Sequence, residues 1–149
     1  ADGQHPVGTL PALIAPILEE KASYVVGCRS NRNDSKGLRS ALARFVRGYM
    51  ELIVKAVSRK TVPDDVTSGF VAIDREAVKF FNEGMLEQYP EPQMCLRIGL
   101  SSFKATGVPV EQSNRAHGQS TISLGHAIRF LYRFNIIVLA SLFQSGGPK

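Results

Sequence analysis

Apolar residues follow two different spacings along the chain, one typical of helices and the other typical of short buried strands. Apolar side chains three or four residues apart predict helices, and short continuous apolar runs between turn residues predict strands. The predicted helices cover residues 9–18, 38–57, 75–81, 92–100 and 123–143, and the predicted strands cover residues 23–28, 70–73 and 103–112. This alternation of helices and strands predicts an α/β fold.

Two local signals refine the predicted helices. Pro16 lies inside the first helix and is expected to kink or shorten it, because proline lacks a backbone donor and its ring clashes with the preceding turn. Asp74 directly precedes the helix at 75–81, and its side chain is expected to cap the first turn.

Composition sets the size and class of the protein. The 149 residues are 44% hydrophobic, which is enough for one compact domain with its own core. A net charge of +5 favours anionic partners, such as nucleotides, lipid phosphates, an acidic membrane surface or nucleic acid. The aromatic residues sit at core-like helical spacing and are not interleaved with basic ones, which argues against nucleic acid. The longest apolar run, 136–143, falls far short of the roughly 20 residues that a membrane-spanning helix needs.

The two cysteines point to a reducing compartment. Cys28 and Cys95 lie in apolar stretches and lack the Cys-x-x-Cys spacing of a metal site. A reduced, cytoplasmic setting is the simpler interpretation, and a disulfide between the two is the alternative.

Oxygen ligands for a cation occur at the start of the sequence. Asp2 and Gln4 are two residues apart, a spacing that lets both reach one hard cation. The alternative is that Asp2 caps the helix that follows Pro6.

A second polar segment surrounds Asp65. This residue precedes Thr-Ser-Gly-Phe, in which Gly69 lets the backbone approach a ligand closely. The alternative is a turn in which the Asp65 side chain bonds to Thr67 or Ser68.

Several arginines lie where they could bind phosphate. Arg29 follows the first predicted strand, Arg39 opens the long helix, and Arg115 lies in an Arg-x-x-Gly-x-Ser segment that Gly118 and Ser120 complete. Guanidinium groups grip phosphate through paired hydrogen bonds, so arginines on loops at one end of a sheet could hold a diphosphate or a lipid phosphate. The alternative is a set of solvated surface arginines.

Three segments together resemble the family-2 glycosyltransferases with a GT-A fold. These are Asp-Gly-Gln-His-Pro at 2–6, Asp-Val-Thr-Ser-Gly-Phe at 65–70 and the segment 108–120, and their order and spacing are similar to those of the polyprenyl-phosphate branch, which includes enzymes like dolichol-phosphate mannose synthase. The resemblance implies that Ala1 and Asp2 end an Asp-x-Asp signature. It also implies a partial GT-A fold, Rossmann-like, with a mostly parallel sheet flanked by helices. Residues 1–149 would form one domain, the acceptor-side portion of a catalytic domain without its nucleotide-binding half.

The same resemblance implies a function and a set of site residues. The function would be metal-assisted transfer of a sugar from a nucleotide-sugar donor to a lipid-phosphate or saccharide acceptor, with the isolated chain inactive. Asp2 and Gln4 would hold Mg²⁺ or Mn²⁺, and Asp65 would lie near the reaction centre. The phosphate-binding residues would be Arg29, Arg39, Arg115 and Ser120.

Two departures from the family pattern affect this interpretation. Gln93 stands where the family usually has Glu, and an amide cannot act as a base, so Glu91 is the candidate substitute. Val71 replaces a common Arg, which weakens the expectation of tight acceptor binding.

A non-catalytic basic module that binds an anionic membrane or nucleic acid is the alternative function. Arg129 and Arg133 beside Phe130, Leu131, Phe134 and Ile137 suggest a final helix that docks on a membrane or partner, although core packing would also explain its apolar side chains. We therefore expect a cytoplasmic protein, with peripheral association at the inner face of the membrane as a further expectation. The missing half that the resemblance implies would leave an unpaired sheet edge and an uncovered apolar face. We therefore expect the chain to dimerise through that edge or to be only marginally stable, with Val25, Val26 and Phe70 exposed to a second copy.

Overall fold

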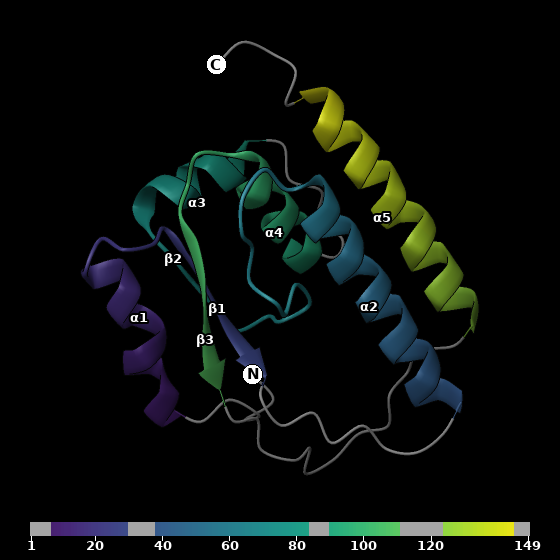
Figure 1. Cartoon of the computed structure of the whole chain (residues 1–149), viewed down its shortest axis with the longest axis horizontal. Helices are drawn as coiled ribbons and strands as arrows, with labels where there is room; N and C mark the ends of the chain where they lie inside the picture. The colour runs from purple at the N-terminus through teal and green to yellow at the C-terminus, as the bar shows by residue number, and fades with distance from the viewer. Residues whose placement is uncertain (1–6, 30–37, 84–89, 111–123, 145–149) are drawn as a thin grey trace.

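The computed structural model describes residues 7–29, 38–83, 90–110 and 124–144, in which helices surround a small sheet (Figure 1). A short 3-10 helix, η1 (Val7–Thr9), leads into the first α-helix. The elements that follow are α1 (Leu10–Leu18), β1 (Tyr24–Arg29), α2 (Leu38–Val57), β2 (Val71–Ile73), α3 (Arg75–Asn82), α4 (Pro90–Leu100), β3 (Ala105–Val110) and α5 (Leu124–Gln144). The predicted α/β class is confirmed.

The sheet is mixed, with strand order β2-β1-β3, whereas a mostly parallel sheet was expected. β3 runs parallel to β1, and β2 runs antiparallel to it. The loop before β2 is bonded to the carboxyl end of β1, where the Gly27 amide donates to the Phe70 carbonyl at 2.8 Å. The chain therefore enters β2 at that end and runs back along β1. β3 follows two further helices, and such a long connection allows parallel pairing.

Alternate residues of β1 face two apolar layers, because successive strand side chains point to opposite faces. On one face, Val25 packs with Leu13 of α1 and with Ala22. On the other face, Tyr24 and Val26 join a larger core built mainly from α2, α4 and α5. Val25 and Val26 are both 0% exposed, so the expectation that they face a second copy is wrong. The cause is that β1 is the central strand, with α1 packed on one face and the core of α2, α4 and α5 on the other.

The local predictions for the helices had different outcomes. Asp74 caps α3 as predicted, with its Oδ1 accepting from the Ala77 amide at 2.7 Å. Pro16 lies within α1, and the helix continues to Leu18. α4 begins at Pro90, two residues earlier than predicted, because proline fits the first turn of a helix.

The final helix packs on the core, as the alternative interpretation of its apolar residues predicted. Phe134 and Ile137 are buried, and Phe130 and Leu131 pack against the same cluster. A hydrogen bond of 2.8 Å from the Tyr49 hydroxyl of α2 to Asn135 Oδ1 of α5 joins the two neighbouring helices. Within the described ranges, no helix is long and apolar enough to cross a membrane.

Candidate functional site

The candidate site lies at the carboxyl end of β1, where the strand meets the loop that precedes β2. β1 and its neighbour β3 run parallel and end together, with Arg29 opposite Val110. In open α/β sheets, ligands bind beyond the carboxyl ends of parallel strands, so this edge is where a site is expected.

Arg29 and Asp65 form the centre of the site. Arg29 Nε donates to Asp65 Oδ2 at 2.6 Å, and Arg29 Nη2 donates to Oδ1 at 2.8 Å. The Arg29 backbone amide adds a longer bond of 3.4 Å to Oδ2. The Asp65 side chain is 0% exposed, whereas that of Arg29 is 21% exposed. A two-point ion pair of this kind fixes the plane of the guanidinium group.

Thr67 completes the arrangement around the ion pair. Its hydroxyl accepts a bond of 2.9 Å from Arg29 Nη2 and donates one of 3.2 Å to Asp65 Oδ1. The bond from Thr67 to Asp65 is the local turn contact that the alternative interpretation of Asp65 predicted, and it coexists with the ion pair. The loop therefore holds the Arg29 side chain from two sides.

Close packing brings this loop onto the strand. Ser68 Oγ donates to the Gly27 carbonyl at 2.7 Å and accepts from the Phe70 amide at 3.3 Å. A Cβ atom at Gly27 would lie 2.6 Å from Phe70 Cδ1, so only glycine fits there without a shift. The position of Asp65 beside Arg29 thus depends on Gly27, Ser68 and Phe70.

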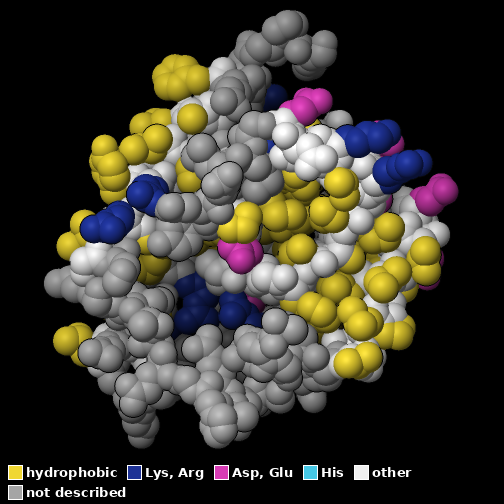
Figure 2. Space-filling view, turned by 180° about the vertical axis from the view of Figure 1, so that it is seen from behind, with side chains coloured by type: hydrophobic (Ala, Val, Ile, Leu, Met, Phe, Trp, Pro, Cys, Tyr) yellow, Lys and Arg dark blue, Asp and Glu magenta, His cyan; other side chains and the backbone are white. Residues whose placement is uncertain are grey.

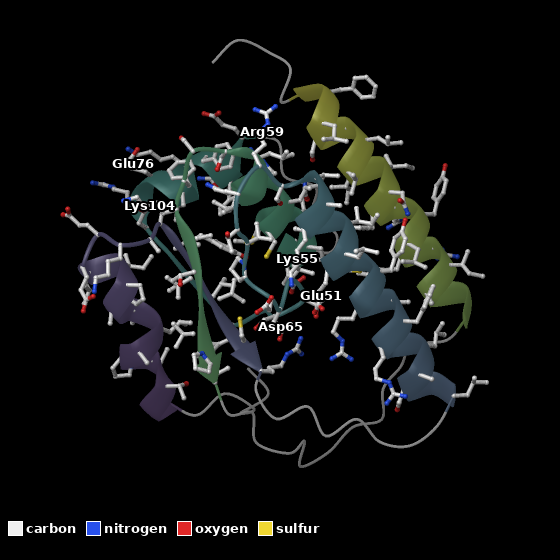
Figure 3. The ribbon with its side chains drawn as sticks, in the orientation of Figure 1. Glu51, Lys55, Arg59, Asp65, Glu76 and Lys104 are labelled. Atoms are coloured by element: carbon white, nitrogen blue, oxygen red, sulfur yellow. The ribbon has the colours of Figure 1, made fainter. Side chains whose placement is uncertain are left out.

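Further charges surround the pair. Hydrogen bonding to Asp65 raises the pKa of the Arg29 guanidinium above its ordinary value, burial opposes the rise, and the charges of Asp65 and Glu51 add to it. Lys55 Nζ donates to Asp64 Oδ1 at 2.6 Å, and this bond raises the pKa of Lys55. Figure 3 shows Glu51 and Lys55 of α2 on the side of the helix near Asp65. Because its pKa is raised, Arg29 remains charged throughout the physiological range of pH.

Glu91 lies close to the same loop. It belongs to the first turn of α4 and is half-buried. Its Oε1 would lie 3.5 Å from a Cβ atom at Gly69, so the carboxylate borders the loop that carries Asp65. Gln93, where the resembled glycosyltransferases usually have Glu, is 4% exposed in the same helix.

The remaining predicted site residues fall elsewhere. Asp2, Gln4, Arg115 and Ser120 lie outside the described residues, and Arg39 belongs to α2 but its side chain is not described. The structure thus joins Arg29 to Asp65 and places Glu91 beside Gly69 of the same loop. Within the described ranges no cluster of three or more His, Cys, Asp or Glu side chains could hold a metal ion, and the predicted ligands lie outside those ranges.

Sequence reasoning missed the contributions of Thr67, Ser68 and Gly27 to the shape of the site. It placed hydroxyls in the loop but did not predict that Thr67 would bond to Arg29 or that Ser68 would bond to β1. A signal was present in Gly27, since a glycine inside an apolar strand marks close approach of another backbone.

Comparison with known proteins does not assign the chain to a family. No protein-family model matches the chain, and no curated protein matches it either.

Proposed function

We propose that this chain is part of a glycosyltransferase that moves a sugar from a nucleotide-sugar donor to a lipid-phosphate or saccharide acceptor at the cytoplasmic face of a membrane. The observation that carries the proposal is Arg29, which is held rigidly by Asp65 and Thr67 at the carboxyl end of parallel strands. The three sequence segments that resemble the family support it independently.

In this proposal Arg29 binds a phosphate group of the donor or of the acceptor. Asp65 occupies Nε and Nη2, and no described residue accepts a hydrogen bond from Nη1. The side chain is partly exposed, so Nη1 can donate to a phosphate oxygen. Because the guanidinium is already fixed, little side-chain entropy is lost when the phosphate binds.

Asp65 and Glu91 then take different roles. Both oxygens of Asp65 accept hydrogen bonds from Arg29, so Asp65 positions the arginine and balances its charge. Glu91 is the carboxylate that could accept a proton from a hydroxyl acceptor. A lipid-phosphate acceptor is already ionised and needs little help from a base.

The divalent ion belongs to the part of the site that is proposed from sequence alone. Mg²⁺ or Mn²⁺ on Asp2 and Gln4 would neutralise the charge that develops on the leaving nucleoside diphosphate. The chain's own phosphate ligands in the proposal are Arg29, Arg39, Arg115 and Ser120.

The test is release of nucleoside diphosphate by the full-length protein that contains this chain, supplied with a panel of nucleotide sugars and polyprenyl phosphate. Activity should require Mg²⁺ or Mn²⁺ and stop in excess chelator. Arg29→Lys keeps the charge but loses the two-point geometry, so kcat/KM should fall about 30-fold or more, which corresponds to about 2 kcal/mol.

Arg75→Lys on the exposed start of α3 is the matched control and should leave activity unchanged. Circular dichroism checks that both variants are folded. Absence of transfer with every donor, or full activity of Arg29→Lys, would overturn the proposal.

A non-catalytic module that binds an anionic membrane is the second candidate. The observation that favours it is the exposed apolar and basic surface of α5, on which Arg129 and Arg133 are both exposed. Vesicle binding by a full-length protein that releases no nucleoside diphosphate would favour this candidate over the transferase.

A further inference from the structure

α5 carries a stripe of exposed apolar side chains on the face opposite its core contacts. Its members recur every three or four residues and so lie on one side of the helix. They are Ile128, Tyr132, Ile136, Leu139 and Phe143, with Tyr132 68% and Phe143 83% exposed. They are distinct from Phe134 and Ile137, which are buried in the core.

α2 carries a second exposed stripe beside the first. Leu38, Phe45 and Leu52 are 88%, 64% and 66% exposed and also share one side of their helix. The opposite side of α2 supplies Val46, Met50 and Val54 to the core, with which Phe134 and Ile137 of α5 also pack. Both stripes therefore point away from the core.

The two stripes meet along the line where α2 and α5 touch. Tyr49 and Asn135 are joined by their side-chain hydrogen bond, and the Tyr49 ring packs edge-on to Phe134, with ring centroids 6.5 Å apart. Phe45 and Leu52 lie one turn before and after Tyr49, and Tyr132 and Leu139 lie one turn before and after Asn135. Figure 1 shows the two helices side by side, and the hydrogen bond places the two stripes on either side of their contact. We call the eight exposed side chains of the two stripes the apolar platform.

Basic side chains border the platform. Arg129 and Arg133 are exposed on α5 one position after Ile128 and Tyr132, and α5 has no Asp or Glu. On α2, Arg44 is exposed one position before Phe45, and Glu51 is the single acidic residue of that helix. Figure 2 shows apolar side chains with Lys or Arg among them on the side where α5 lies. An apolar face with arginines beside it is typical of helices that lie in a membrane interface.

We propose that the apolar platform docks on an anionic lipid bilayer, with Tyr132, Leu139 and Phe143 among the apolar side chains that insert and Arg129 and Arg133 contacting lipid phosphates. The proposal names the surface for the membrane location in the proposed function, and it does not depend on sugar transfer. Charge complementarity selects this occupant over a second copy, since two platforms face to face would bring arginines together at a cost in electrostatic energy.

The chain has no tryptophan, so a single introduced one reports on one surface. Tyr132→Trp places the reporter on the platform, and Leu18→Trp places it on the exposed, uncharged face of α1 as a matched control. With vesicles of phosphatidylglycerol and phosphatidylcholine, the emission of Tyr132→Trp should shift to the blue and that of Leu18→Trp should not. A shift in Leu18→Trp alone, or in neither variant, would overturn the proposal.

Vesicle flotation separates the apolar and the electrostatic contributions. Arg129→Gln with Arg133→Gln should weaken binding about 25-fold, because each basic residue near an anionic surface contributes about fivefold. The matched control is Arg75→Gln with Lys104→Gln, two exposed basic residues outside α2 and α5. Leu139→Gln with Phe143→Gln should also weaken binding, whereas Ile14→Gln with Leu18→Gln on α1 should not.

Two further results would contradict docking on an anionic bilayer. One is equal binding to phosphatidylcholine vesicles that lack anionic lipid, or binding that high salt leaves unchanged. The other is concentration-dependent self-association in sedimentation velocity, abolished by Leu139→Gln with Phe143→Gln, without vesicle binding by the parent chain. That result would assign the platform to a second copy. None of these assays contains a nucleotide sugar, so their failure and the failure of the transferase proposal are distinguishable.

Discussion

Arg29 and Asp65 are 36 residues apart in the sequence, and their side chains meet through two hydrogen bonds at the end of β1. The pair joins the strand to the loop that leads into β2. Asp65 is fully buried, so its charge depends on Arg29 and on the neighbouring donors for compensation. The contact that shapes the candidate site therefore also stabilises the fold.

Arg29→Ala is expected to destabilise the protein by about 3 kcal/mol. The change leaves the Asp65 carboxylate buried without its main partner, and the partial exposure of Arg29 places the effect at the lower end of the range for such pairs. Urea unfolding measures the change. Lys55→Ala, which removes the exposed pair with Asp64, is the control and should cost less than about 1 kcal/mol. Equal losses for the two variants would contradict a structural role for the buried pair.

Two glycines in helices should respond to alanine with opposite signs. A Cβ atom at Gly99 of α4 would lie 2.8 Å from Ser58 Cβ and 2.9 Å from Val62 Cγ1. Overpacking of this kind costs about 1–3 kcal/mol, and the gain in helix propensity offsets about 1 kcal/mol of it, so Gly99→Ala should be destabilising.

Gly48 of α2 is the matched control, because an added Cβ atom there meets nothing within 4 Å. Gly48→Ala should stabilise the protein by about 1 kcal/mol through helix propensity alone. Thermal or urea unfolding measures the stability of the two variants. A gain in stability in both would show that α4 has room for a Cβ atom beside Ser58.

The sequence predicted the helices better than the sheet. The period of α2 and the cap at Asp74 are local signals, and both helix positions agree with the structure. β2 has three residues, too few to carry information about direction, and its antiparallel pairing follows from the path of the preceding loop. That path is set by contacts between Ser68, Phe70 and Gly27, which are distant in sequence.

The sequence predicted individual site residues but not the contacts between them. Arg29 and Asp65 were each singled out, but their ion pair depends on how the loop folds back on β1. The same limit applied to α5, where apolar residues occur on both sides of the helix and spacing alone could not show which side faces the core. Tertiary contacts place Phe134 inside and leave Tyr132 exposed.

Arg115→Ala in the full-length protein should reduce kcat/KM for a phosphate-bearing substrate by an amount equal to about 2–5 kcal/mol in transition-state free energy. In the proposed function Arg115 holds a phosphate group, and the change removes that contact; Arg115 itself lies outside the described residues. Steady-state kinetics measure the loss, with Arg75→Ala as the control. A change below about 0.5 kcal/mol, the usual size for a surface substitution, would assign Arg115 to the solvated surface.

The buried thiol of Cys95 should make the fold sensitive to alkaline pH. Burial raises the pKa of Cys95 from 9.0 to about 12, and burial also raises the pKa of Tyr24, whose hydroxyl lies 3.4 Å from the sulfur. The folded state therefore holds these protons more tightly than the unfolded state. The free energy of unfolding that these protonated groups contribute is fully present below the unfolded pKa and is lost as pH rises toward the folded value, by up to about 1.4 kcal/mol per unit of pH for each group.

Urea unfolding between about pH 8 and 10.5 should show this fall in the free energy of unfolding, and Cys95→Ala should reduce its slope. Cys28→Ala, which removes a half-buried thiol, should retain most of the slope, and a flat profile for the parent chain would contradict the burial of Cys95.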